Sequence, residues 1–221
     1  MKGDLEVLGS EFIFSFQNQE LHLNTQRSLF WSEQKMLVVS DLHLGKAGHF
    51  RRHGIPIPRQ IHISDLLRVN SLLEYYQPKT ILFLGDLFHS DQNDEWSDFI
   101  HWSNYNHQVN QILVQGNHDI LSSQDYNETR IQLLSQLDEG PFSFTHEPTD
   151  TFGYNIAGHI HPAIRLRGLA RQGEILPCFS FELNHALLPA FGNFTGNHPI
   201  KPRKGASVFA IAEDVLVSLT A

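Results

Sequence analysis

The feature that most constrains this chain is a pattern that occurs five times, in which a short apolar run ends in a carboxylate, amide or imidazole. The runs are residues 37–40, 81–84, 112–114, 142–145 and 154–157, and the polar residues at their ends are Asp41 and His43, Asp86, Asn117 with His118 and Asp119, His146, and His159 with His161. Such runs are typical of strands buried on both faces. Because open α/β sheets bind ligands at the carboxyl ends of their strands, the pattern predicts one shared site.

The residue types at these ends indicate metal chemistry. One Asp-x-His after an apolar run is equally well explained as a capped turn, but five strand ends of this kind in one chain are not. Imidazole, carboxylate and amide ligands without thiolate suit manganese, iron or zinc better than magnesium or calcium. The sequence therefore predicts a metal centre built from the ends of several strands.

Length and composition predict one globular domain over residues 1–221. The hydrophobic content of 41% and the charged content of 18% are ordinary for a globular protein. Cys178 is the single cysteine, so no internal disulfide forms and a reducing compartment is expected. The first residues carry acids and lack the apolar segment of a secretory signal, and no apolar run is long enough to span a bilayer. We therefore expect a soluble, cytoplasmic protein without a membrane partner.

Periodicity predicts the arrangement of the elements. Residues 11–31 alternate in short pieces and predict an antiparallel hairpin or meander at a sheet edge. Helical spacing predicts helices over 58–76, 94–107 (with Asp94 as the cap) and, more weakly, 126–137. Strands that alternate with helices favour parallel pairing with right-handed crossovers, and the short strands after residue 141 favour a second sheet. The expected fold class is α/β, with two mixed sheets packed face to face and helices outside.

The motifs resemble a known family. In order they read Asp41-x-His43, Gly85-Asp86, Gly116-Asn117-His118-Asp119, His146 and Gly158-His159-x-His161, which is similar to the calcineurin-like metallophosphoesterases. Residues 40–46, 49–52 and 188–192 more narrowly resemble the bacterial ligase-associated DNA-damage-response endonucleases. The resemblance implies a four-layer α/β/β/α sandwich.

The same resemblance implies a role for each residue of the motifs. Asp41, His43 and His161 would hold one divalent ion, Asn117, His146 and His159 a second, and Asp86 would bridge the two. Two such ions clamp the attacking and leaving oxygens of an in-line displacement at phosphorus. Manganese is the metal that the resemblance implies, with iron and zinc as alternatives. His118 would protonate the leaving oxygen or stabilise the charged phosphorus centre, and Asp119 would orient its imidazole.

Basic residues beside these motifs are candidates for binding substrate. Lys46, His49, Arg51 and Arg52 follow the first ligand pair in a loop rich in glycine and proline, and either a solvated loop or a phosphate-binding rim explains them. His89 is a candidate substrate contact or a histidine at the start of a helix. Arg165 and Arg167 follow the last ligand, so both basic groups are expected at one rim, on a chain whose net charge is -8.

Three functions fit the sequence. The first is a metal-dependent phosphodiesterase acting on nucleic acid, specifically a repair endonuclease for single-stranded or distorted DNA, with a DNA ligase and a helicase as partners implied by the resemblance. The second is a small-molecule phosphoesterase that cleaves nucleotides, and the third is a catalytically silent repair scaffold. The complete ligand set disfavours the scaffold, whereas the first two share all the catalytic residues.

Overall fold

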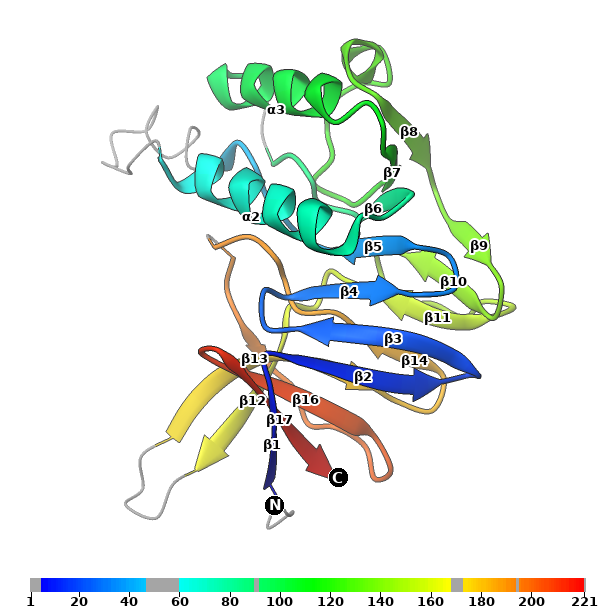
Figure 1. Ribbon diagram of the computed structural model, residues 1–221, viewed down its shortest axis with the longest axis vertical. Coiled ribbons are helices and arrows are strands. Elements are labelled where there is room, and N and C mark those ends of the chain that lie inside the picture. The colour runs from blue at the N-terminus through cyan, green and yellow to red at the C-terminus, as the bar shows by residue number, and fades with distance from the viewer. Residues whose placement is uncertain (1–4, 47–59, 90–91, 168–172, 194, 221) are drawn as a thin grey trace.

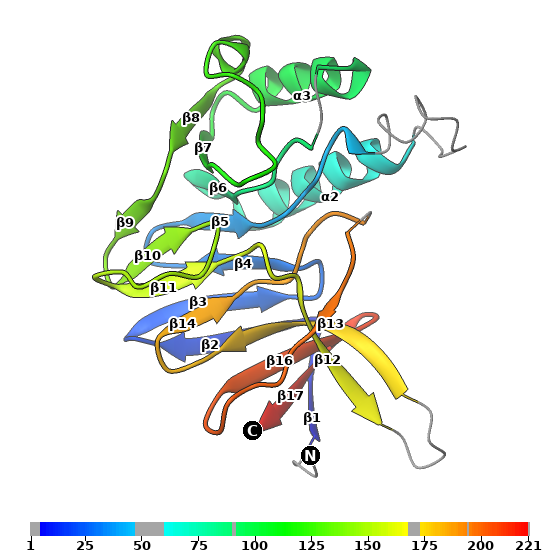
Figure 2. The same ribbon diagram turned by 180° about the vertical axis from the view of Figure 1, so that it is seen from behind.

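The computed structural model describes residues 5–46, 60–89, 92–167, 173–193 and 195–220 (Figure 1). Within these residues the strands form one sheet of seven and one of ten. The two sheets pack face to face, as Figure 2 shows from behind. The α/β fold class with two mixed sheets is therefore confirmed.

The seven-stranded sheet carries the first half of the chain in sequence order. Its strands are β2 (Glu11–Phe16), β3 (Gln19–Asn24), β4 (Ser28–Trp31), β5 (Met36–Val39), β6 (Thr80–Leu84), β7 (Asn110–Val114) and β8 (Ile131–Leu134). Pairing is antiparallel from β2 to β5 and parallel from β5 to β8. The predicted meander at the sheet edge is confirmed, and the parallel strands bring the ends of β5, β6 and β7 to one edge.

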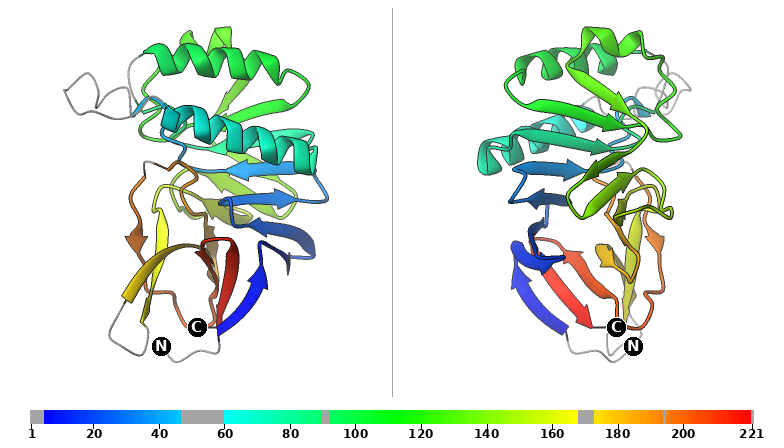
Figure 3. Two further views of the ribbon diagram at one scale, coloured as in Figure 1. Left: turned by 60° about the vertical axis from the view of Figure 1, so that its left-hand side comes forward. Right: turned by 90° about the vertical axis from the view of Figure 1, so that its right-hand side faces the viewer.

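Helices α2 (Gln60–Tyr76) and α3 (Asp94–Tyr105) cover the outer face of this sheet. Strand β6 illustrates this packing, because alternate side chains of a strand point to opposite faces of the sheet. Ile81 and Phe83 pack against the helices, whereas Leu82 and Leu84 pack between the sheets. In the right-hand view of Figure 3 both helices lie on the same side of the seven-stranded sheet.

Two predicted helix features are wrong. The cap of α3 is Asn93, whose Oδ1 accepts hydrogen bonds from the Glu95 and Trp96 amides at 2.8 and 3.3 Å, and Asp94 is the first helical residue. The predicted helix over 126–137 is a short 3₁₀ turn, η1 (Asp125–Glu128), followed by strand β8. A short apolar run fits the periodicity of a helix and that of a strand equally well. Residues 131–134 form a strand because the free edge of β7 offers them backbone pairing.

The ten-stranded sheet holds the second half of the chain and the N-terminal strand. Its main path runs through β1 (Leu5–Gly9), β17 (Val215–Thr220), β16 (Ser207–Ala212), β13 (Gly173–Phe181), β14 (His185–Leu187), β11 (Tyr154–Ala157), β10 (Phe142–Thr145) and β9 (Leu137–Glu139). Strand β12 (Pro162–Arg167) pairs with β13 and with β15 (His198–Pro199). Strands β10, β11 and β14 are parallel, so β10 and β11 also end at a common edge.

The outer face of the ten-stranded sheet differs from that of its neighbour. Its apolar side chains, which include Cys178 and Val208, pack with Ile164 of β12 and Leu176 of β13. Both described helices, α2 and α3, lie on the other side of the molecule, against the seven-stranded sheet. Across the described residues, no helix has the length and hydropathy needed to cross a membrane.

Candidate metal centre

The predicted ligands come from the ends of five strands. β5, β6 and β7 end just before Asp41, Asp86 and Asn117, while β10 and β11 of the facing sheet end just before His146 and His159. Backbone hydrogen bonds join the first two loops, since the Asp41 amide donates to the Gly85 carbonyl at 3.1 Å and the His43 amide donates to the Asp86 carbonyl at 2.9 Å. The His159 amide of the facing sheet donates to Asp41 Oδ2 at 3.1 Å, so the edges of the two sheets meet at one site.

The backbone at this site is in an unusual conformation. Asp41, His43, Asp86, His159 and His161 have positive φ angles, at 55°, 50°, 50°, 63° and 52°. Residues with a Cβ rarely adopt this left-handed region, which costs each of them about 1–2 kcal/mol. Strain of this kind concentrates at functional sites, where the surrounding structure holds it.

Gly158 shows how tightly the strand ends pack. A Cβ at this position would collide with the Ser40 hydroxyl and lie 2.7 Å from an Asp41 carboxylate oxygen. Only glycine lets β11 approach β5 closely enough to place His159 and His161 beside Asp41. The glycine of the Gly-His-x-His motif is therefore a packing requirement of the site.

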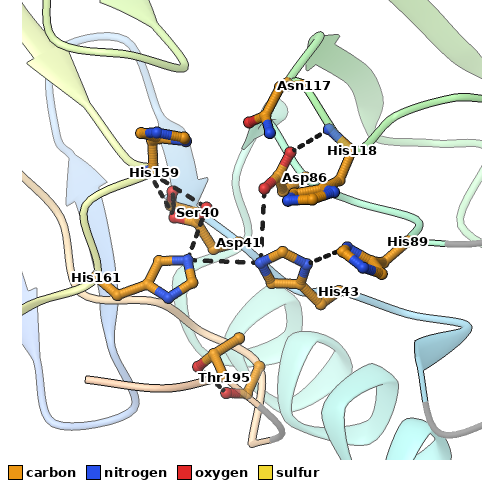
Figure 4. A network of polar contacts seen from close by, with 12 residues as sticks. Ser40, Asp41, His43, Asp86, His89, Asn117, His118, His159, His161 and Thr195 are labelled. Carbon is orange, nitrogen blue, oxygen red and sulfur yellow. Dashed lines mark hydrogen bonds and ion pairs between the residues drawn. The ribbon is translucent and has the colours of Figure 1, made fainter. Parts of the chain in front are cut away.

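A first cluster of possible ligands consists of Asp41, His43 and His161, each offering an atom within 4.8 Å of the others (Figure 4). The His161 Nε2 lies 3.2 Å from Asp41 Oδ1 and 3.5 Å from the His43 Nε2. Asp41 and His43 are buried, whereas His161 is half-buried. The cluster is therefore open to solvent on its His161 side.

A second cluster consists of Asp86, His146 and His159, again within 4.8 Å of one another. The His146 Nε2 lies 3.1 Å from both the His159 Nδ1 and the Asn117 Oδ1, so the Asn117 amide lies beside this cluster. His146 is buried and Asn117 is exposed. This cluster, like the first, has a buried floor and an open rim.

Asp86 lies between the two clusters, as the predicted bridging role requires. Its Oδ2 lies 3.6 Å from the His43 Nε2 of the first cluster, and its Oδ1 lies 3.3 Å from the His146 Nε2 of the second. The His118 amide also donates to Oδ1, at 2.9 Å. One carboxylate therefore faces both candidate metal positions.

The donor atoms fit divalent ions. The His161 Nδ1 donates to the Gly196 carbonyl and the His146 Nδ1 donates to the Leu84 carbonyl, both at 3.1 Å, which leaves each Nε2 as a lone pair facing its cluster. In the first cluster this lone pair faces a second imidazole nitrogen and a buried carboxylate, and a cation between them satisfies all three. Bound divalent ions would supply Lewis-acid polarisation of phosphoryl oxygens and a nucleophile at neutral pH.

The surrounding protein shifts the pKa values of the two buried histidines, His43 and His146, in opposite directions. Burial lowers the pKa of His43 to about 3, against the opposing charges of Asp86 and Asp41. Burial also lowers the pKa of His146, but its hydrogen bond to Asp86 and the charge of that carboxylate outweigh burial and raise the pKa to about 9. Burial raises the pKa of Asp86, and His146 with the His118 amide outweighs it, holding that pKa at about 2. Without metal, His43 is thus neutral and the second cluster carries a proton.

His118 lies at the rim of the site, where Figure 4 shows its ring beside Asp86 and His89. It is half-buried, and its ring centroid lies 5.7 Å from that of His43. Asp119 does not have the predicted orienting role, because its carboxylate accepts hydrogen bonds from the amides of Leu87, Phe88 and Gly116 at 2.8, 3.0 and 2.8 Å. Those three bonds connect the loops after β6 and β7, so Asp119 holds the backbone of the site in place.

The candidate substrate residues divide into two groups. His89 lies inside the centre, with its Nδ1 3.1 Å from the His43 Nδ1 and its ring centroid 4.0 Å from that of His118. Lys46 is half-buried, and its charge helps to lower the pKa of His43. The other three candidates, His49, Arg51 and Arg52, lie outside the described residues.

Two contributors to the site were missed in the sequence. Ser40 is buried and its hydroxyl donates to the Asp41 carboxylate or to the Leu84 carbonyl. Gly196 orients His161 through its carbonyl oxygen. The position of Ser40 next to a ligand was a usable signal, whereas no residue type marks a backbone carbonyl that lies 35 residues from its partner.

Comparisons with known proteins agree with this geometry. The family model for calcineurin-like phosphoesterases matches residues 34–179. The crystal structure of Pseudomonas putida nuclease MPE superposes with a TM-score of 0.82 at 27% sequence identity, over 95% of this chain and 100% of that one. A phosphoesterase from E. coli, Yfce, matches over 82% of this chain and 90% of its own at 16% identity, and its TM-score of 0.41 supports no inference about the site. No match was found among curated proteins.

The chain belongs to the calcineurin-like phosphoesterase family, whose model spans all the predicted ligands. It is a metal-dependent phosphoesterase with two candidate sites for divalent metals. Its similarity to the Pseudomonas putida nuclease extends beyond the family model into the C-terminal strands, since 95% of the chain is covered.

Proposed function

We propose that this chain is a dinuclear-metal phosphodiesterase that cleaves nucleic acid, and specifically an endonuclease acting on single-stranded or distorted DNA. The observation that carries the proposal is the position of Asp86, whose two oxygens face one imidazole of each cluster. Two ions held on either side of one carboxylate suit in-line displacement at a phosphodiester. The similarity to a nuclease over nearly the whole chain supports nucleic acid as the substrate.

The rim of the site supports a polymeric substrate. A diester carries one negative charge, so its recognition depends on an open path beside the metals more than on cations around a terminal phosphate. Asn117 is exposed, and His159 and His161 are half-buried, so the ligand atoms on this side reach solvent. A strand of nucleic acid that continues in both directions fits such an open rim, and endonuclease activity requires that continuity.

Basic residues lead away from the centre along β12. Strand β12 begins directly after His161 and, with β13, extends away from the rest of the molecule in Figures 1 and 2. Arg165 is exposed on it. Strand β15, which pairs with Pro162 and Ala163 of β12, is followed two residues later by the exposed Lys201. At about 3.3 Å of rise per residue, Arg165 lies about 13 Å along the strand from His161, within a few nucleotides of the metals.

In this proposal manganese is the working metal, because the ligands are imidazole, carboxylate and amide without thiolate. His118 is the group that protonates the leaving oxygen, and its position at the rim beside Asp86 supports the role. The enzyme would act in the cytoplasm in DNA repair, with a DNA ligase and a helicase as partners. That last part rests on the family resemblance alone.

The test is a manganese-supplemented panel of a phosphomonoester, a chromogenic phosphodiester, a free nucleotide, single-stranded DNA and a circular single strand. We expect cleavage of the diester and of both DNAs, because a circle has no ends and only an endonuclease opens it. The Asp86→Asn variant serves as the metal-site control on every substrate. Good hydrolysis of the free nucleotide with intact DNA would replace the proposal with the small-molecule phosphoesterase.

A further inference from the structure

An ion pair on α2, formed by a buried carboxylate and a half-buried guanidinium, has no role in the chemistry described above. Asp65 is 3% exposed, and the Arg68 Nη1 donates to its Oδ1 at 3.0 Å. Burial raises the pKa of Asp65 and lowers the pKa of Arg68, and each charge opposes the shift in the other. Burying the charge of Asp65 is costly, and such a pair is weak evidence for stability. The contacts of Asp65 and Arg68 with other segments therefore indicate what the ion pair does.

Arg68 binds two segments that lie far from it in sequence. Its Nη1 donates to the Phe191 carbonyl at 3.0 Å, and its Nη2 donates to the Gln26 carbonyl at 2.8 Å. The guanidinium carbon lies 4.1 Å from the centroid of the Phe191 ring, which adds a cation–π contact. The planar fork of arginine suits these simultaneous contacts, which a lysine ammonium would not reproduce.

Asp65 holds the next part of the same segment. The Asn193 amide N–H donates to Asp65 Oδ2 at 3.2 Å, and the Asn193 side-chain amide donates to Oδ1 at 2.6 Å. Arg27, in the turn between β3 and β4, adds a hydrogen bond to the Ala190 carbonyl at 3.2 Å. Residues 190–193 are thus tied from one side to the helix and the turn. We call residues 190–193 the brace segment.

The other side of the brace segment lies against the first metal cluster. The Phe191 amide donates to the Ser40 carbonyl at 2.7 Å, and the Gly192 amide donates to the Asp41 carbonyl at 3.1 Å. A Cβ at Gly192 would collide with the Leu42 carbonyl, so the segment sits directly on the strained ligand backbone.

The chain that leaves the brace segment reaches the second ligand of this cluster. The Thr195 hydroxyl donates to the Gly192 carbonyl at 2.7 Å, and the Gly196 carbonyl accepts from the His161 Nδ1 at 3.1 Å. Figure 4 places Thr195 on the same side of the centre as His161 and His43. These contacts connect the Asp65–Arg68 ion pair to Asp41 and His161, whereas none of them involves a residue of the second cluster.

We propose that Asp65 and Arg68 are positioning residues for the first metal cluster. They hold the brace segment so that it fixes the backbone of Asp41 and the ring orientation of His161. The inference concerns metal affinity and does not depend on DNA being the substrate. Loss of an outer partner of a ligand typically lowers metal affinity about 10- to 100-fold. The effect should fall on one of the two ions.

The test is a manganese titration of metal-free protein by calorimetry. His161→Ala and His159→Ala identify the binding step that belongs to each cluster. We expect Arg68→Met to weaken the first-cluster step about 10- to 100-fold and to leave the other step unchanged. Arg68→Lys should bind manganese at the first cluster almost as weakly as Arg68→Met, because lysine keeps the charge and lacks the planar fork of arginine. Asp65→Asn should give an intermediate loss of manganese affinity at that cluster. Arg130→Met is the matched control, since it removes an exposed arginine that binds the Asn104 side chain.

Thermal unfolding of the same metal-free variants separates positioning from general destabilisation. The Asp65→Leu, Arg68→Met double variant replaces both charges, so the chain is expected to fold without a lone buried charge and still to show the selective loss. Equal weakening of both steps, or an unchanged first-cluster step in Arg68→Met and in the double variant, overturns the proposal. An unchanged titration of His161→Ala also overturns it, because the effect is transmitted through that ligand.

Discussion

Asp86→Asn is the most informative single change, because one side chain faces both clusters. The substitution keeps the shape and one oxygen, so the amide of His118 retains its acceptor and the loop after β7 stays in place. What it removes is the negative charge that lies 3.6 Å from the His43 Nε2 and 3.3 Å from the His146 Nε2. The loss is therefore electrostatic and shared between the two sites.

The size of the effect follows from that geometry. Removing even an indirect partner of a ligand costs about 10- to 100-fold in affinity, which is about 1.4–2.7 kcal/mol per ion. Because Asp86 faces both clusters, at least this loss is expected twice. Manganese content after dialysis should therefore fall from near two ions per chain to below one, and calorimetry should show both binding steps weakened.

Asp138→Asn is the control, because it removes an exposed carboxylate that belongs to neither candidate cluster and whose side chain accepts a hydrogen bond from Gln136. It should bind like the unmodified protein. If Asp86→Asn kept two ions with unchanged affinity, or lost one ion alone, Asp86 would not be a shared ligand. The mechanism built on it would then be wrong.

Three further predictions concern catalysis, substrate and pH. His118→Ala should retain both ions and lose about 10²- to 10⁴-fold in turnover of a diester with a poor leaving group, measured as kcat, and near-normal turnover would exclude its acid role. Arg165→Ala with Lys201→Ala should weaken DNA cleavage and flatten its salt dependence, while a chromogenic diester is cleaved normally. The matched control is Lys35→Ala with Lys79→Ala, which changes two exposed residues that precede β5 and β6 at the opposite sheet edge. Manganese affinity at the second cluster should rise about tenfold per pH unit below pH 9, because the ion displaces a proton from His146, and a pH-independent affinity there would contradict the raised pKa. In metal-free protein the same raised pKa stabilises the fold fully below the ordinary value of 6.5, and this contribution is lost as pH rises through 9.

The sequence predicted the site better than its surroundings. Asp41, Asp86 and His146 were identifiable because each follows an apolar run, and the carboxyl ends of such strands meet at one edge. The family was identifiable from the same motifs. These signals are local, since a strand and the residue after it are adjacent in the chain.

What could not be predicted depends on contacts between distant residues. Residues 131–134 carry apolar side chains that suit a helix or a strand, and pairing with β7 decided between them. Asp119 lies beside His118 in sequence, yet its carboxylate turns to three amides of the backbone. Asp65 and Arg68 have the i, i+3 spacing of an ordinary surface pair on a helix, and only the packing of residues 190–193 against α2 shows that Asp65 is buried and that Arg68 is half-buried.

The positive φ angles at five candidate ligand positions bear on how this enzyme can be engineered. At about 1–2 kcal/mol each they sum to about 5–10 kcal/mol, which is comparable to the whole net stability of a typical domain. Glycine at the half-buried His161 would relieve part of that cost, so the metal-free variant should melt at a higher temperature than the parent while binding metal poorly. A selection for thermostability alone would therefore favour inactive sequences, and libraries intended to stabilise the protein should keep these five positions fixed.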